Sequence, residues 1–152
     1  MRCVTIMTPD PLTVDGMRSV ATAAGLLLGH QKTHLAVLDA NGRHIGMFGL
    51  DDLSSMLVPR MALAGDVTAN LRFITDDPGD LRARFGEFAD RPVSEFVDRN
   101  APTLKPDASA MEAFRLVCRS GRPIAVIAHD SGKFEGIITY LDAFRGLIHA
   151  SS

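Results

Sequence analysis

A short segment that opens with a glycine and closes with an aspartate six residues later occurs twice in this sequence. The first copy spans residues 46–52 (GMFGLDD) and the second spans residues 136–142 (GIITYLD). Each glycine begins an apolar run typical of a strand, and each aspartate follows where a helix should begin. A glycine allows a ligand or another backbone to come close. A carboxylate just past a strand end, joined in the second copy by the hydroxyl of Thr139, is well placed to contact a polar ligand.

The offset between the two copies, from Gly46 to Gly136, continues on both sides of this segment. Identical residues recur at that offset without a gap, from Thr13 and Thr103 near the start of each half to Leu57 and Leu147 near its end. A match over a whole supersecondary unit indicates an internal duplication.

Each half has the pattern β-α-β-β-α. An Asn-Gly turn at residues 41–42 marks the hairpin of the first half. Asp15 and Asp107 are the expected N-caps of the first helix in each half, over 17–29 and 108–119. Neither half is long enough for a comfortable core of its own. We therefore expect an α/β (α+β) fold in which two β-α-β-β-α repeats pack with pseudo-twofold symmetry.

The expected division is repeat 1 over residues 1–58, a linker or insert over 59–92, and repeat 2 over 93–150. The insert has no counterpart at the repeat offset, and its charges nearly balance. Its apolar residues Leu81, Phe85 and Phe88 have the i, i+4, i+7 spacing of one amphipathic helix, after a turn at 76–79. The sequence does not show whether the insert covers a cleft, holds a dimer or faces a partner.

Composition excludes several function classes. The 152 residues carry a net charge of −2, which argues against a nucleic-acid-binding protein. No apolar run reaches the roughly 18 residues of a membrane span, and the N-terminus lacks a secretion signal. Cys3 and Cys118 then fit two reduced thiols of a cytoplasmic protein. The five histidines show no metal-ligand spacing, and no nucleophile, Walker loop or dinucleotide motif is present, so we expect neither a metal site nor an enzyme.

The complete pattern resembles a tandem pair of cystathionine-β-synthase (CBS) domains, also called a Bateman module. The resemblance spans residues 6–53 and 96–143. In each span a lead-in precedes a Thr-containing strand, a helix with Ala and Leu, an apolar strand, a turn with glycine, and the Gly-to-Asp segment. The whole order appears twice in register.

This resemblance implies a non-catalytic sensor that binds AMP, ADP, ATP or S-adenosylmethionine between its repeats and requires no cofactor. Carried over, Thr139 would contact phosphate and Asp142 the ribose hydroxyls, since a carboxylate accepts two hydrogen bonds from a vicinal diol. Thr103 with Leu104 and Ile124 with Ala125 would border the base, by polar and apolar contact respectively. The remaining implied ligand-binding residues are Gly136 and the first-repeat counterparts Asp52, Thr13 and Gly46.

The first repeat departs from the family pattern because Gly49 stands where the second repeat has Thr139. Losing one hydrogen bond costs about 0.5–1.5 kcal/mol, so we expect the Asp142 site to fill first and the Asp52 site to be weak or empty. A plainer reading makes both aspartates helix N-caps. Arg60, Lys133 and Arg122 could reach phosphates, although solvated surface charge is the favoured role for each.

The chain contains no effector domain, so occupancy would be passed to an unknown effector protein or through a change of oligomer. The resemblance implies a homodimer, with no nucleic acid or membrane partner. The apolar residues of the closing helices could form a contact surface between subunits or pack in the core of the monomer. These residues are Leu53, Met56, Leu57, Phe144, Leu147 and Ile148. The alternative function is a dimerisation or protein-interaction module whose clefts bind no ligand.

Overall fold

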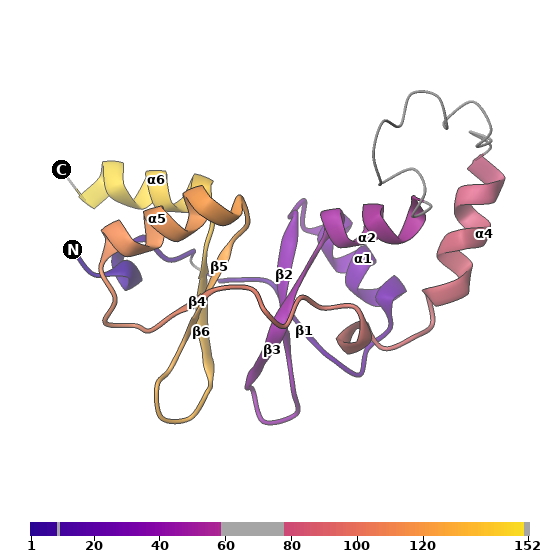
Figure 1. Ribbon diagram of the computed structural model, residues 1–152, viewed down its shortest axis with the longest axis horizontal. Helices are drawn as coiled ribbons and strands as arrows, with labels where there is room; N and C mark the ends of the chain where they lie inside the picture. The colour runs from indigo at the N-terminus through magenta and orange to yellow at the C-terminus, as the bar shows by residue number, and fades with distance from the viewer. Residues whose placement is uncertain (9, 59–77, 151–152) are drawn as a thin grey trace.

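A computed structural model describes residues 1–8, 10–58 and 78–150, and it shows two similar halves side by side (Figure 1). Each half has a three-stranded sheet in which the first strand is parallel and the last antiparallel to the middle one. Repeat 1 comprises β1 (Thr13–Asp15), α1 (Val20–Gly29), β2 (His34–Leu38), β3 (His44–Gly49) and α2 (Leu50–Leu57). Repeat 2 comprises β4 (Thr103–Leu104), α5 (Ala110–Ser120), β5 (Ile124–Ile127), β6 (Phe134–Ile138) and α6 (Tyr140–Ala150). The expected α/β class and β-α-β-β-α order are confirmed.

The sequence predicts one gapless offset between the repeats, and this prediction is wrong for the middle strands β2 and β5. Thr13 pairs with Ala36 on β2, whereas its counterpart Thr103 pairs with Ala125 on β5. Ala36 of β2 therefore corresponds to Ala125 of β5, which is one position short of the offset that relates the flanking elements of the two repeats. The loop before β2 is one residue longer than the loop before β5, and the β2–β3 hairpin is one residue shorter. The two length changes cancel, which is why the identities on either side stay in step.

The N-caps also differ from expectation. Ser19 and Ser109, rather than Asp15 and Asp107, cap the first helix of each repeat. The Ser19 Oγ accepts the N–H of Thr22, and the Ser109 Oγ accepts that of Glu112, each at 3.1 Å. Asp15 instead accepts the Met17 N–H at 2.8 Å, inside a turn that delays the helix to Val20. In repeat 2, Ser-x-x-Glu is the capping-box pattern in the sequence.

Each lead-in packs into the core of the other repeat. The 3₁₀ helix η1 (Cys3–Ile6) contacts α5 and α6, and Cys3 and Ile6 are fully buried there. In Figure 1 this indigo segment lies with the orange and yellow helices of repeat 2. Reciprocally, Val93 of the 3₁₀ helix η3 (Val93–Glu95) is buried in the core of repeat 1. The exchange ties the two repeats together.

The two sheets also meet directly across the pseudo-twofold axis. Their hairpin ends exchange two backbone hydrogen bonds, from His44 N–H to the Gly132 carbonyl at 3.3 Å and from Phe134 N–H to the Gly42 carbonyl at 3.2 Å. The rings of His44 and Phe134 stack with centroids 5.9 Å apart. Above them a small apolar cluster joins the sheets through Ala36, Met47, Ala125 and Ile137. The predicted pseudo-twofold packing is present.

The helix predicted in the insert is α4 (Pro78–Phe88), which packs against α2 at the far end of repeat 1 (Figure 1). Phe88 is buried in the repeat 1 core and Phe85 packs partly against it, while Leu81 stays exposed. Arg60 and the first half of the turn expected at 76–79 lie outside the described residues. Within the described ranges, no helix is both long and apolar enough for a membrane span.

Candidate functional site

A cleft with a volume of about 350 Å³ lies where the two repeats meet. One wall is the strand-to-helix corner of repeat 2, residues 139–142. The facing walls are two loops that lead from a helix into a middle strand, residues 31–34 of repeat 1 and 121–123 of repeat 2. The cleft therefore contains Thr139 and Asp142, which the sequence singles out, together with basic residues from both repeats.

Local geometry fixes Thr139 and Asp142 to one another. The Asp142 N–H donates to the Thr139 Oγ1 at 3.1 Å, so Thr139 caps α6 and Asp142 stands three positions into the helix. The Thr139 hydroxyl in turn donates to Asp142 Oδ2 at 2.8 Å. Thr8 donates to the same oxygen at 2.8 Å, and Arg145 donates to Oδ1 at 2.8 Å. The cap of this helix is thus the threonine and not the aspartate.

The Asp142 carboxylate is ionised at neutral pH although only 8% of the residue is exposed. Burial alone would raise its pKa, but the hydrogen bonds from Thr8 and Thr139 and the positive charges of Lys32 and Arg145 outweigh burial and bring the pKa below its ordinary value of 3.8. Oδ2 accepts two hydrogen bonds and Oδ1 accepts one. A carboxylate has about four acceptor positions, so Oδ1 retains one for a ligand hydroxyl.

Two positively charged groups lie at the same cleft, the Lys32 side chain and the N-terminus of α6. Lys32 is exposed on the repeat 1 loop, close enough to Asp142 to lower its pKa. Among the residues that the structure describes, it forms no ion pair within 4.0 Å. The N-terminus of the eleven-residue helix α6 faces the cleft through Thr139 and Tyr140 and contributes its partial positive charge. These groups together favour an anionic ligand.

The corresponding corner of repeat 1 is occupied by the protein's own side chains. Asp52 Oδ2 accepts the Gly49 N–H at 2.8 Å and Nη2 of Arg122, from repeat 2, at 3.0 Å. Burial raises the pKa of Asp52, and the Gly49 N–H and Arg122 offset this only in part. The Arg122 side chain is 23% exposed and ion-paired, so its expected role as solvated surface charge is wrong. Lys133 is exposed on the β5–β6 hairpin, away from the cleft.

Gly49 leaves room for His34 rather than for a ligand. A Cβ at this position would lie 2.6 Å from the His34 Nε2 and 2.7 Å from the Asp51 Oδ1, and closer still to the His34 Cδ2. The His34 Nε2 stands 3.1 Å from Asp51 Oδ1, at an angle that makes no hydrogen bond. A hydroxyl side chain like that of Thr139 would not fit here without displacing the imidazole.

The other predicted site residues do not reach this cleft. Thr103 and Leu104 line a separate hollow beside Asp107 and Glu112. Ile124 and Ala125 are buried in β5, and Thr13 is exposed on β1.

The two predicted glycines lie directly against the lead-ins. A Cβ at Gly46 would lie 2.8 Å from the carbonyl of Asp98, and one at Gly136 would lie 2.7 Å from the Met7 Sδ.

The sequence did not predict four residues that lie in or beside the site, which are Thr8, Lys32, His34 and Arg145. Thr8 lies 134 positions from its partner Asp142, and no local pattern indicates that pairing. Lys32 carried a signal, because it and Arg122 are basic residues in the same loop of the two repeats. Among the described residues, no group of three or more His, Cys, Asp or Glu side chains is arranged to hold a metal ion.

Comparison with known proteins agrees with this fold. A family model described as CBS domain matches residues 3–58 and again residues 93–149. The fold is similar to that of the CBS-pair protein CBSX2 from Arabidopsis thaliana, with 23% identity, a TM-score of 0.73, and coverage of 99% of this chain and 96% of that one. A structure of CBSX2 in complex with AMP gives 21% identity, a TM-score of 0.72, and coverage of 99% and 98%.

A CBS domain-containing protein of unknown function from Bacillus anthracis is also similar, with 17% identity, a TM-score of 0.72, and coverage of 100% of this chain and 95% of that one. No curated protein matches the chain. The two family matches, one on each repeat, together span most of the sequence, and the chain therefore belongs to the CBS domain family as a pair of CBS domains.

Proposed function

We propose that this protein is a non-catalytic sensor that binds an adenosine nucleotide in the cleft beside Thr139 and Asp142. The observation that carries the proposal is Asp142 itself. Its carboxylate is buried and ionised, retains one acceptor position, and borders a cleft that also contains Lys32 and a helix N-terminus. A carboxylate for a sugar hydroxyl beside positive charge for a phosphate is the pair of groups that a nucleotide requires.

Binding would rearrange one hydrogen bond. The Thr139 hydroxyl now donates to Asp142 Oδ2, and it has only one hydrogen to donate. If a phosphate oxygen takes that hydrogen, Oδ2 regains an acceptor position. Asp142 then offers one position on each oxygen, which suits the two hydroxyls of a ribose. The phosphate and ribose contacts thus support each other.

Two further observations support this ligand class. The cleft volume of about 350 Å³ falls within the usual range of small-molecule sites, about 300–1,000 Å³. CBSX2, which has the same fold, is known in complex with AMP. AMP, ADP, ATP and S-adenosylmethionine share the adenosine part that Asp142 would hold. Lys32 favours the phosphate-bearing members.

Calorimetric titration of the full chain with AMP and with adenosine tests the proposal. The Lys32→Gln variant should bind AMP about two- to fivefold more weakly, because an exposed charge pair contributes up to about 1 kcal/mol. Its affinity for adenosine should not change. Lys105→Gln removes an equal charge outside the cleft and should bind both ligands like the wild type. Absence of binding by AMP, ADP, ATP and S-adenosylmethionine would refute the proposal.

One observation favours the second candidate function, a homodimer or protein-interaction module. The helices of repeat 2 expose a row of large apolar side chains, whereas α4 packs against α2 of repeat 1. The row comprises Met111 (79% exposed), Leu141 (68%), Phe144 (51%), Leu147 (38%) and Ile148 (66%). Leu53, by contrast, belongs to the core of repeat 1, with Met56 and Leu57 packed against it. Exposed apolar rows of this kind mark association surfaces.

Two equally exposed methionines allow a matched test of this surface. Met111 lies on α5 within the row, and Met17 lies on the turn before α1 in repeat 1, each 79% exposed. If the row forms a dimer, Met111→Glu should shift the mass measured by light scattering toward the monomer, and Met17→Glu should not. An identical monomeric mass for the wild type and both variants would exclude a homodimer through this row.

A further inference from the structure

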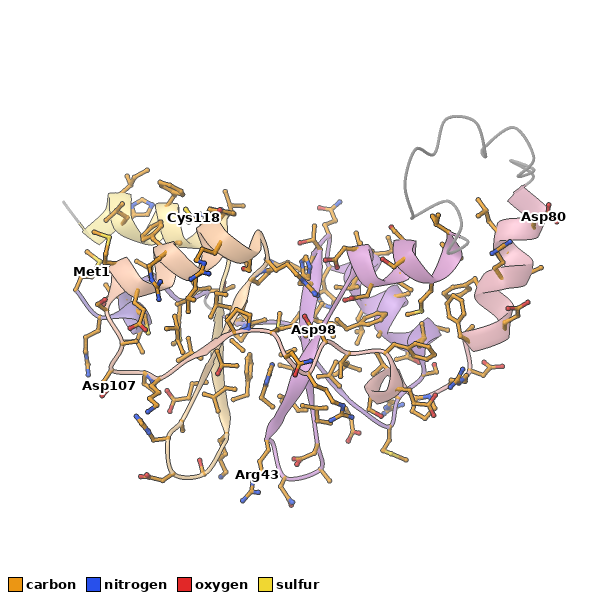
Figure 2. All side chains as sticks on the ribbon, in the orientation of Figure 1. Met1, Arg43, Asp80, Asp98, Asp107 and Cys118 are labelled. Atoms are coloured by element: carbon orange, nitrogen blue, oxygen red, sulfur yellow. The ribbon has the colours of Figure 1, made fainter. Side chains whose placement is uncertain are left out.

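Arg122 lines the cleft between the repeats, and its guanidinium forms ion pairs with two carboxylates of repeat 1 and one of the segment that leads into repeat 2. Its Nη2 lies 3.0 Å from Asp52 Oδ2, its Nη1 lies 3.2 Å from Asp98 Oδ2, and its Nε lies 3.2 Å from Asp51 Oδ2. Figure 2 shows Asp98 where the two halves meet, on the chain that crosses between them. One guanidinium therefore joins a loop of repeat 2 to the start of α2 and to the crossing segment.

The same guanidinium borders the proposed nucleotide cleft, where Arg122 and Thr139 both line the wall. A phosphate is a strong partner for a guanidinium, because its oxygens match the planar fork of N–H donors. It would therefore compete with the three carboxylates for one cation. Lys32 forms no ion pair within 4.0 Å among the described side chains, so Arg122 is the cation of the cleft whose ion-pair partners would change.

We propose that Arg122 is a latch between the repeats that a phosphate-bearing ligand opens by drawing the guanidinium away from Asp51, Asp52 and Asp98. This inference rests on the proposed function, and it says how ligand binding in the cleft would change the contact between the two repeats. A ligand shifts an equilibrium only by its differential affinity for the two states. The latched state withholds Arg122 and the open state supplies it, so phosphate binding favours the state in which the repeats are less firmly joined.

The latch also reverses the expected effect of the repeat 1 carboxylates. If Asp52 held the ribose of a second ligand, loss of its charge would weaken binding. If it holds Arg122, loss of a latch carboxylate frees the arginine and tightens binding of a phosphate ligand, because the competent state becomes more populated. The sign of the change in affinity distinguishes the two roles.

The test uses the isosteric variant Asp98→Asn in the full chain, titrated with AMP and adenosine. Asp98 lies outside the cleft lining, and its Oδ1 acceptor for the Asn100 N–H is kept by asparagine. We expect AMP to bind about three- to tenfold more tightly, as follows from weakening one charged hydrogen bond, and adenosine to bind as before. Asp107→Asn removes an equal charge from an exposed position of repeat 2 and should leave both affinities unchanged.

Arg122→Gln and hydrogen exchange complete the design. Arg122→Gln should weaken AMP binding without affecting adenosine. AMP should increase exchange in α2 of the wild type, and not in Arg122→Gln. If the wild type binds AMP but Asp98→Asn binds it no more tightly, or if Asp107→Asn gains as much, the latch is refuted and the proposed function stands. If neither the wild type nor any variant binds AMP, ADP, ATP or S-adenosylmethionine, the proposed function is refuted, and the latch that rests on it is refuted with it.

Discussion

The hydroxyl of Thr8 donates a 2.8 Å hydrogen bond to the carboxylate of Asp142, 134 positions further along the chain. Both residues are buried, and Thr8 is also held by its backbone N–H, which donates to the Ile137 carbonyl at 2.7 Å. The N-terminal lead-in thus completes the corner of repeat 2 and sets the orientation of its carboxylate. The candidate site is therefore complete only when the lead-in is in place.

Thr8→Val should destabilise the fold by about 1.5–3 kcal/mol, because it removes a buried hydrogen bond to a charged group and leaves the carboxylate less well satisfied. Urea unfolding measures this change. Thr5→Val makes the same substitution at an exposed position of the same lead-in and should cost less than about 0.5 kcal/mol. Equal losses in the two variants would show that the bond to Asp142 contributes nothing.

Acid should destabilise the junction between the two hairpins through His44. Burial lowers the pKa of His44 below its ordinary value of 6.5, and its buried Nε2 has no hydrogen-bond partner in the part of the chain that the structure describes. The unfolded chain therefore binds this proton at a higher pH than the folded protein does. Stability from this group is complete above about pH 6.5 and is lost as the pH falls through the folded pKa.

His44→Phe should remove that part of the acid loss, because phenylalanine keeps the stack on Phe134 and cannot take up a proton. Unfolding free energies at pH 7.5 and pH 5 should differ less in the variant than in the wild type. His129→Phe, at an exposed histidine of the other hairpin, serves as the control. An unchanged pH dependence in His44→Phe contradicts the assignment.

Restoring the family hydroxyl in repeat 1 should fail for a steric reason. Gly49→Ser places a Cβ against the His34 ring, and overpacking of this kind costs about 1–3 kcal/mol. In a His34→Ala background the same change should cost much less. A double-mutant cycle on unfolding free energies measures the coupling between the two positions. Additive costs would mean that His34 does not close this corner.

The observed N-caps lead to a paired prediction. Ser109→Ala should destabilise the protein by about 1 kcal/mol through loss of the bond from the Glu112 N–H. Asp107→Ala, at the position that the sequence suggested, should have an effect within about 0.5 kcal/mol, since this side chain is 73% exposed. Thermal unfolding ranks the two variants, and the reverse order would contradict the cap.

Much of the fold follows from local sequence patterns. The repeated apolar runs and the Asn-Gly turn predict the strands and the pseudo-twofold pairing, and Thr139 with Asp142 marks the corner that borders the cleft. The one-residue slip of β2 against β5 could not be seen, because the compensating length changes restore the offset on either side. The caps were misplaced because aspartate suits the preceding turn as well as the cap.

The remainder of the site depends on contacts that no local pattern encodes. The bonds from Thr8 to Asp142 and from Arg122 to Asp52 join segments 134 and 70 positions apart. Gly49 in place of a hydroxyl residue predicts a weaker first site, and that prediction awaits a binding measurement. The structure adds that His34 and Arg122 fill this corner, which only packing of the two repeats can show.

Calorimetric titration of AMP into the wild type, Asp142→Asn and Asp52→Asn tests the central claim most directly, with thermal unfolding as the check that each variant is folded. We predict one AMP per chain, at least tenfold weaker binding by Asp142→Asn, and binding no weaker than wild type by Asp52→Asn. Two AMP per chain, or a larger loss in Asp52→Asn than in folded Asp142→Asn, would contradict the account.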